Sequence, residues 1–578
     1  MQGHASLRAI GESGLWRAPQ GRIRSVTLPP CCYLLAAKAG HCCMSTKRGL
    51  FLIVASTVVI PGIGLESRAT AQQVGRLDVV EATIADVQRA LQERRITCRE
   101  LVLAYLQRID AYDKKGPALN AVQTVNPAAV QEAERLDREF AAKGPVGPLH
   151  CVPLVVKDQL ETRDMPTTFG SVLFAGFRSG RDATVVSRLR AAGAIVIAKT
   201  TMGEFASGYL GSAFGVVRNA YAPDRMPSGS SGGTGSSVAA SFATAGIAED
   251  TGGSTRGPAS VHSLVGLRPT VPLVSRFGLL PGRPSQDTVG PIGRTVRDVA
   301  MVLGVIAGYD PNDPATAESV GHVAASYTAT LTPDGLRGKR IGVVRAPLSP
   351  TTDTTTPDYR RVRAVIDRAF SDLRRLGADV VDPPMVPDLA SRSSAIFRDN
   401  RHEREAATNA YLGGLAAPPF KTLADILMSG RVLPGRARQM VTNLGRSTSD
   451  PAFARLMLAR EQLRREVLAA MADARLDAFA YATYDAPPPL IPVDALSRAD
   501  IDSEGPGFNA LLSSVIAFPA ITVPAGFTDD GLPVGLELMA RPFQESMLLT
   551  LAHAFEQGTR HRRPPPTTPP LAGGAGAR

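Results

Sequence analysis

The sequence is poor in aromatic residues and in cysteine. Phe, Trp and Tyr make up 5% of its 578 residues, and only one residue is Trp. The six cysteines form no Cys-x-x-Cys pair and no Cys/His spacing of the kind that binds zinc. This scarcity argues against a zinc module and against a redox-active dithiol.

A dense basic run with interleaved aromatic residues is also missing, although the formal net charge is +11. Residues 1–71 hold eight Lys or Arg against two Asp or Glu, so more than half of the excess lies there. The other 507 residues carry a net charge of +5, which is ordinary for a soluble surface. We therefore expect no nucleic-acid partner.

Residues 44–71 have the pattern of a signal peptide. Lys47 and Arg48 precede the uncharged run 49–65, and the small residues Ala69-Thr70-Ala71 follow it. An uncleaved membrane anchor is the alternative, but the run has only 17 residues and contains Pro61, whereas a spanning helix needs about 20 residues. We expect an exported protein, periplasmic or secreted, with no stable membrane insertion once the signal is removed.

Residues 1–43 precede this signal and have no pattern of their own. We interpret them as an upstream extension that arises from a wrongly assigned start site. At the other end, residues 564–578 are rich in Pro and Gly, a composition that predicts a disordered tail.

Between these ends, short apolar runs alternate with helical periodicity, which predicts an α/β fold with a mixed, mostly buried sheet. Hydrophobic residues make up 44% and charged residues 20% of the chain, enough for a large core. No linker divides residues 79–563, so we expect a single large domain with helices on both faces of the sheet. Residues 385–510 are predicted to form the substrate pocket or its lid. Strands are expected near 152–156, 194–198, 341–344, 378–381, 478–482, 520–523 and 534–538, and helices near 80–91, 101–109, 185–192, 362–373, 453–472 and 547–555.

Two short Gly/Ser-rich segments, 228–233 and 251–254, flank an Ala-rich stretch at 238–247 that we expect to be helical. Such segments are often flexible loops. Within a folded interior, however, their backbone N–H groups need acceptors, and glycine-rich backbone near a helix end is suited to bind an anion or an oxyanion.

Four interpretations of these segments compete. A phosphate-binding loop requires a Lys after the glycines, and none is present. A nucleophile elbow is matched by Gly229-Ser230-Ser231-Gly232-Gly233, with Ser231 as nucleophile, but residues 222–227 cannot form the strand that should precede it. A binding module without chemistry is the third. The fourth is a serine hydrolase in which a lysine is the base. Lys157 ends an apolar strand, where burial would favour the neutral amine that can accept a proton. The alternative for Lys157 is a surface position with Asp158 as its ion-pair partner.

The order of several motifs resembles the amidase signature family over roughly residues 80–563. They are Lys157-Asp158, GSSGG at 229–233, DTGGSTRGPA at 250–259, AGAIVIAKTTMGEFASG at 192–208, Gly266-Leu267-Arg268-Pro269-Thr270 and the segment from Phe518. Several motifs in the correct order are far more specific than one Gly-x-Ser-x-Gly match.

The resemblance implies a Ser-Ser-Lys triad. Ser254 would be the nucleophile, Ser230 the bridging serine after a cis peptide bond, and Lys157 the base. The backbone N–H groups of Thr251, Gly252, Gly253 and Ser254 would surround the oxyanion. Three further residues would have supporting roles: Ser231 would orient Lys157, and Asp250 would pair with Arg256.

Five positions depart from the family pattern, and none is expected to touch the triad. Ser228 and Cys151 stand where Gly is usual, Ala220 stands where Pro is usual, and Ala248-Glu249 replace Gly-Thr. We expect Cys151 to be a small buried residue, with a place in the pocket wall as the alternative.

The resemblance implies an amidase that cleaves the C–N bond of linear carboxamides through an acyl-enzyme, with no metal and no other cofactor. The expected partner is a small-molecule amide, and a homodimer is left open. The alternatives are the A subunit of a glutamine-dependent tRNA amidotransferase, against which the signal peptide argues, and a non-catalytic binding module.

Overall fold

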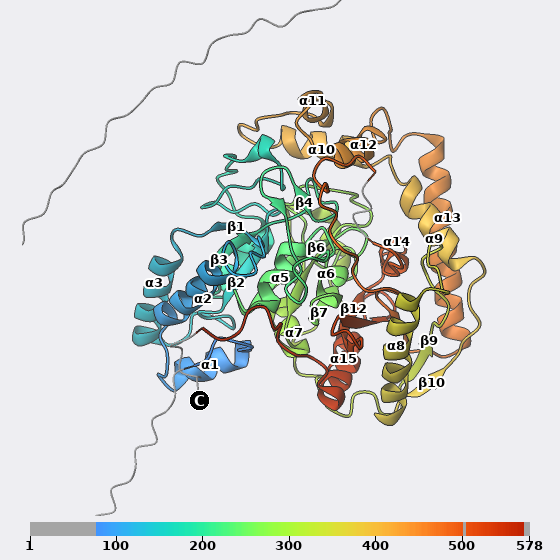
Figure 1. The fold of residues 1–578 in the computed structure, drawn as a ribbon, viewed down its shortest axis with the longest axis horizontal. Helices are drawn as coiled ribbons and strands as arrows, with labels where there is room; N and C mark the ends of the chain where they lie inside the picture. The colour runs from blue at the N-terminus through green and yellow to red at the C-terminus, as the bar shows by residue number, and fades with distance from the viewer. Residues whose placement is uncertain (1–76, 501–504, 572–578) are drawn as a thin grey trace, which may run out of the picture. The chain divides into compact units, whose positions relative to one another are not determined.

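The computed structural model describes residues 77–500 and 505–571 (Figure 1). The expected upstream extension and signal peptide lie outside the described residues. Within the described part of the chain, no helix is both long enough and apolar enough to cross a membrane.

An eleven-stranded mixed sheet forms the centre of the described unit (Figure 1). Its strand order is β1-β3-β2-β6-β8-β7-β12-β13-β11-β9-β10. Strand β2 pairs in parallel with β3 and β6, and β9 pairs in parallel with β10 and β11, while the other neighbours are antiparallel. The strands are β1 Val122–Val125, β2 Pro153–Lys157, β3 Ile195–Thr200, β6 Ala245–Asp250, β7 Val265–Arg268, β8 Thr288–Gly293, β9 Arg340–Val343, β10 Asp379–Val381, β11 Ala478–Ala482, β12 Ala520–Phe527 and β13 Pro533–Met539, with a separate pair β4 Leu210–Gly211 and β5 Gly215–Val216.

Helices cover both faces of this sheet, as the sequence predicts. In β2, Leu154 and Val156 belong to one hydrophobic cluster, which includes residues of α4, α7, α8 and α15. Val155 between them belongs to a second cluster, which includes residues of α2, α3 and α5. Neighbouring residues of a strand point to opposite faces, so each face has its own core. The helices are α1 Ile84–Gln92, α2 Cys98–Tyr112, α3 Ala129–Lys143, α4 Thr184–Ala191, α5 Gly232–Ala239, α6 Arg256–Ser260, α7 Val296–Ile306, α8 Pro357–Arg375, α9 Leu389–Asp399, α10 Arg404–Gly413, α11 Leu423–Met428, α12 Pro434–Val441, α13 Pro451–Asp473, α14 Leu511–Val515 and α15 Glu545–Thr559.

The Ala-rich stretch 238–247 is not one helix, which corrects the expectation. Helix α5 begins earlier, at Gly232, and ends at Ala239, and residues 245–250 form the buried strand β6. Alanine is compatible with either state when the surroundings are fully buried, and here the pairing of β6 with β2 and β8 decides.

Residues 564–571 are ordered, which corrects the expectation of a disordered tail for this part. The buried guanidinium of Arg108 donates to the backbone carbonyls of Thr568 at 2.8 Å and Pro569 at 3.0 Å. Tyr112 also donates to the Pro569 carbonyl, at 2.8 Å. Proline lacks an N–H group but keeps its carbonyl, so a Pro-rich segment can satisfy a buried cation in this way. Residues 572–578 lie outside the described part.

A disulfide joins Cys98 at the start of α2 to Cys151, just before β2. Both cysteines are fully buried, and their Cα atoms lie 5.4 Å apart, a normal spacing for this bond. Cys151 is therefore buried as expected, and it does not line the cavity described below. Its φ of +60° accounts for Gly being the usual residue at this position.

Candidate active site

Lys157 is the last residue of β2 and is completely buried. Its Nζ lies 2.8 Å from Ser230 Oγ, 2.9 Å from Glu249 Oε2 and 3.4 Å from the Glu249 carbonyl oxygen. Burial lowers the pKa of Lys157, although the Glu249 carboxyl acts in the opposite direction. The expected contact between Lys157 and Ser230 is thus present, in surroundings that favour a neutral amine.

Ser230 and Ser231 directly precede helix α5, and the Gly229–Ser230 peptide bond is cis, as the resemblance implies. A Cβ on Gly229 would lie 2.0 Å from the carbonyl oxygen of Gly208, so this close approach requires glycine. Ser231 does not reach Lys157 directly. Its hydroxyl donates at 3.3 Å to the carbonyl of Glu249, the same oxygen that Lys157 approaches.

The nucleophile-elbow interpretation of Ser231 does not fit the structure. Within the described residues, 217–231 contain no strand, only an isolated bridge at Arg225. Ser231 is also completely buried, so its hydroxyl is not presented to a substrate.

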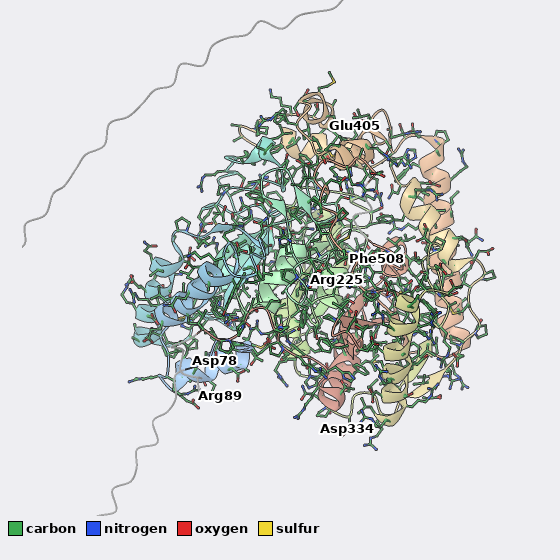
Figure 2. All side chains as sticks on the ribbon, in the orientation of Figure 1. Asp78, Arg89, Arg225, Asp334, Glu405 and Phe508 are labelled. Carbon is green, nitrogen blue, oxygen red and sulfur yellow. A yellow bond between two sulfur atoms is a disulfide. The ribbon has the colours of Figure 1, made fainter. Side chains whose placement is uncertain are left out.

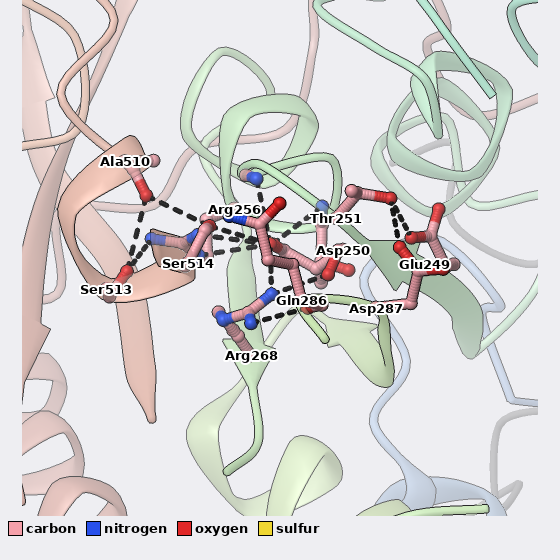
Figure 3. Close-up of polar contacts among 12 residues, drawn as sticks. Glu249, Asp250, Thr251, Arg256, Arg268, Gln286, Asp287, Ala510, Ser513 and Ser514 are labelled. Atoms are coloured by element: carbon pink, nitrogen blue, oxygen red, sulfur yellow. Dashed lines mark hydrogen bonds and ion pairs between the residues drawn. The ribbon is translucent and has the colours of Figure 1, made fainter. Parts of the chain in front are cut away.

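Glu249 contacts the base and corrects the expectation that no departure from the family pattern touches the triad. Besides its contact with Lys157, its Oε1 lies 2.6 Å from Thr251 Oγ1. The same hydroxyl lies 2.8 Å from Asp287 Oδ1, and all of these groups are buried (Figure 3). A hydroxyl has one hydrogen, so both contacts are hydrogen bonds only if one carboxyl group is protonated.

Burial raises the pKa of the Glu249 carboxyl, and the nearby Asp287 raises it further, against the effect of Lys157. A raised pKa favours the protonated form of Glu249, which lies 2.9 Å from Lys157 Nζ. Asp287 also accepts the backbone N–H groups of Gly282 at 2.7 Å and of Arg283 at 2.8 Å. In the sequence, the signal for this contact is the pair of acidic residues that ends the otherwise apolar stretch 245–250.

Asp250 organises the loop that carries Ser254. Its carboxylate accepts from Arg256 and Arg268, whose ion pairs with it are 3.1 and 2.9 Å long (Figure 3). The expected Asp250–Arg256 pair is therefore present. Burial alone would raise the pKa of Asp250, but the two guanidinium groups lower it far below its usual range. Asp250 also accepts the N–H groups of Gly253 at 2.8 Å and Thr255 at 3.1 Å, which holds the turn in place.

Three of the four expected oxyanion donors are available. Within the described residues, the backbone N–H groups of Thr251, Gly252 and Ser254 have no hydrogen-bond partner. The Gly253 N–H donates to Asp250, which corrects its expected role. Gly253 is needed for shape instead: its φ is +119°, and a Cβ there would lie 2.1 Å from Phe508, which Figure 2 labels.

Ser254 is partly exposed and lines a cavity of about 470 Å³. Thr251 and Gly252 lie on the same wall, and much of the rest comes from residues 397–443. Part of the region 385–510, which the sequence predicts to form the substrate pocket or its lid, therefore lines this cavity, whereas β11 within that region belongs to the central sheet. Glu405 on α10, labelled in Figure 2, accepts the N–H of Gly445 at 2.7 Å and so connects α10 to the segment after α12.

Within the described residues, the Ser254 hydroxyl makes no hydrogen bond. The expected hydrogen bond between Ser254 and Ser230 is therefore not formed in this structure.

One cluster has the spacing of metal ligands but not their chemistry. Within the described residues, the only group of three His, Cys or acidic side chains with suitable spacing is Cys98, His150 and Cys151. The two sulfur atoms are joined in the disulfide, so neither is a thiolate ligand.

The chain is similar to known proteins over most of its length. The family model for Amidase matches residues 100–549. Among curated proteins, a probable amidase of Arabidopsis thaliana is 32% identical over 89% of this chain and 96% of its own length. The A subunit of the glutamyl-tRNA(Gln) amidotransferase of Pseudomonas syringae is also 32% identical, over 84% of this chain and 99% of its own.

Solved structures show the same similarity. The native peptide amidase of Stenotrophomonas maltophilia has a TM-score of 0.74 and 38% identity, and the match covers 84% of this chain and 98% of that one. An amidase family protein of Bacillus anthracis has a TM-score of 0.72 and 29% identity, over 84% of this chain and 92% of that one.

Proposed function

Because this chain belongs to the amidase signature family, whose members hydrolyse C–N bonds, we propose that it cleaves linear carboxamides through an acyl-enzyme on Ser254. One observation carries the proposal. A completely buried lysine, Lys157, contacts Ser230 at 2.8 Å, next to the loop that presents Ser254 to the cavity.

The proton path follows from the contacts of a neutral Lys157. Nζ contacts the Glu249 carboxyl, the Glu249 carbonyl oxygen and Ser230 Oγ. A neutral amine has two N–H groups and one lone pair, so it can donate to both Glu249 oxygens and accept the proton of Ser230. Ser230 gives its proton to Lys157 and takes the proton of Ser254, whose oxygen attacks the amide carbon. The proton returns by the same path to the leaving nitrogen, and ammonia or an amine departs. A water molecule then hydrolyses the acyl-enzyme along the same path.

The tetrahedral intermediate carries a negative oxygen, for which the N–H groups of Thr251, Gly252 and Ser254 are candidate donors. Removal of one such donor in comparable hydrolases costs about 3–4 kcal/mol of transition-state stabilisation. No metal and no organic cofactor takes part in this proposal.

The test is a panel of aliphatic, aryl and peptide amides, esters and free glutamine, assayed for ammonia or amine release. We expect turnover of at least one linear carboxamide by the wild type. Turnover of glutamine alone would favour the amidotransferase role, since the chain is 32% identical to such a protein. Binding of amides without any turnover would favour a binding module.

We also propose that the protein is exported, which the disulfide between Cys98 and Cys151 supports, because disulfides persist in oxidising compartments. Export with cleavage near Ala71 would remove the other four cysteines, which all lie at or before residue 43.

N-terminal sequencing and mass after thiol alkylation test this directly on the isolated protein. We expect a new N-terminus near residue 72, no alkylated thiol before reduction and two after it. An N-terminus upstream of Met44, or free thiols without reductant, would contradict the proposal.

A further inference from the structure

The cavity that contains Ser254 is lined by six arginines and by no acidic residue. Arg283 lies on the loop before β8, and the others come from the wall formed by residues 398–438. They are Arg398, Arg401, Arg404, Arg436 and Arg438. Cationic side chains normally avoid such proximity unless an anion compensates them, because like charges repel strongly in a half-enclosed space.

Direct ion pairs are scarce in this cluster, although the charges of Asp287 and Glu249 act on Arg404 and that of Glu204 acts on Arg436. Within the described residues, Arg401, Arg404, Arg436 and Arg438 form no ion pair. Arg404 and Arg436 donate to the same neutral acceptor, the Phe205 carbonyl, at 3.4 and 2.5 Å. Among the described residues, Arg398 is the one of these five arginines that forms an ion pair, with Asp399 at 3.1 Å.

Arg436 gives the cluster the character of a built site. The residue is only 9% exposed, and its Nε has no hydrogen-bond partner within the described residues. Burial lowers the pKa of Arg436 well below its ordinary value, and the neighbouring charge of Arg404 lowers it further, against the effect of Glu204. A buried, incompletely partnered guanidinium is costly, and a bound anion removes that cost.

We propose that the substrate is an anionic amide, which carries a carboxylate in addition to the scissile amide and binds it against these arginines. This inference rests on the proposed function, since it places the carboxylate in the same cavity as Ser254. A planar carboxylate accepts two parallel N–H donors from one guanidinium, which neutral amides cannot match.

The test compares N-acetyl dipeptide amides that differ at one residue: Glu, Met of similar length without charge, or Lys. We expect kcat/KM for the Glu peptide to exceed that for the Met peptide by about tenfold or more, with the Lys peptide lowest. In 0.5 M NaCl the Glu-to-Met ratio should fall, because screening weakens the attraction at the open end of the cavity.

Variants locate the effect. Arg401→Gln and Arg438→Gln should each lower the Glu-to-Met ratio by several-fold. Arg431→Gln is the matched control, because Arg431 is exposed and does not line the cavity, and it should leave the ratio unchanged. Equal ratios in all three variants would overturn the assignment of the carboxylate to this wall.

Calorimetric binding of the same peptides to Ser254→Ala separates this inference from the proposed function. Tighter binding of the Glu peptide without hydrolysis by the wild type would uphold the anion site and overturn the amidase. Hydrolysis with equal kcat/KM and equal affinity for Glu and Met peptides, or a preference for Lys, would overturn the anionic substrate.

Discussion

Replacement of Ser254 by Ala is expected to reduce amide hydrolysis by about 10⁴- to 10⁶-fold, the loss that follows removal of a serine nucleophile in other hydrolases. The fold should not change. Ser254 is partly exposed, and its hydroxyl makes no hydrogen bond within the described residues. Its removal therefore leaves no buried polar group without a hydrogen-bond partner. We expect the free energy of unfolding to change by less than about 0.5 kcal/mol, measured by urea denaturation.

Ser231→Ala is the matched control, because Ser231 lies next to Ser230 but donates only to the Glu249 carbonyl. A fluorophosphonate probe should label wild type and Ser231→Ala at Ser254 and should not label Ser254→Ala. Unchanged turnover in Ser254→Ala would refute the nucleophile assignment. Label on Ser231 in place of Ser254 would also restore the elbow interpretation.

The helices and strands that could be predicted are those whose burial imposes a regular pattern of hydrophobic residues. The run 478–482 forms β11 at those same residues, because a short apolar segment buried on both faces has no other stable arrangement here. The turn from α5 to β6 was not predictable, since Ala and Gly fit either state when no side chain reaches water. Strand β8, with two Gly and one Pro in Thr288–Gly293, gives no strand signal, and its pairing with β6 and β7 is a tertiary effect.

The candidate site divides in the same way. Motif order identified Lys157 and Ser230, and the structure places them in contact. The order of the motifs could not show that the Gly253 N–H donates to Asp250, because that hydrogen bond depends on the geometry of the turn. Nor could it show the arginine cluster, since Arg283 and Arg436 are 153 positions apart and meet only through the packing of the 397–443 segment against the catalytic loop.

Lys157→Met is expected to lower kcat/KM by about 10²- to 10⁴-fold, the usual contribution of a general base. Methionine keeps most of the buried volume, so the fold is preserved better than with Ala. In the wild type, only the neutral amine accepts a proton, so log kcat/KM should rise with pH until Lys157 has lost its proton. Burial lowers the pKa of Lys157, so this acidic limb should level off below 10.5, the ordinary pKa of lysine.

The acidic limb should be absent from the residual activity of Lys157→Met, and its persistence would contradict the assignment of Lys157 as the base.

A second variant, Glu249→Gln, tests whether the charge of Glu249 controls the pKa of Lys157. Burial raises the pKa of Glu249, so we expect Gln to be a good replacement for its protonated carboxyl group. The limb should then stay in place and activity should remain within about tenfold of the wild type. A limb moved to lower pH would mean that Glu249 is an anion that raises the pKa of Lys157.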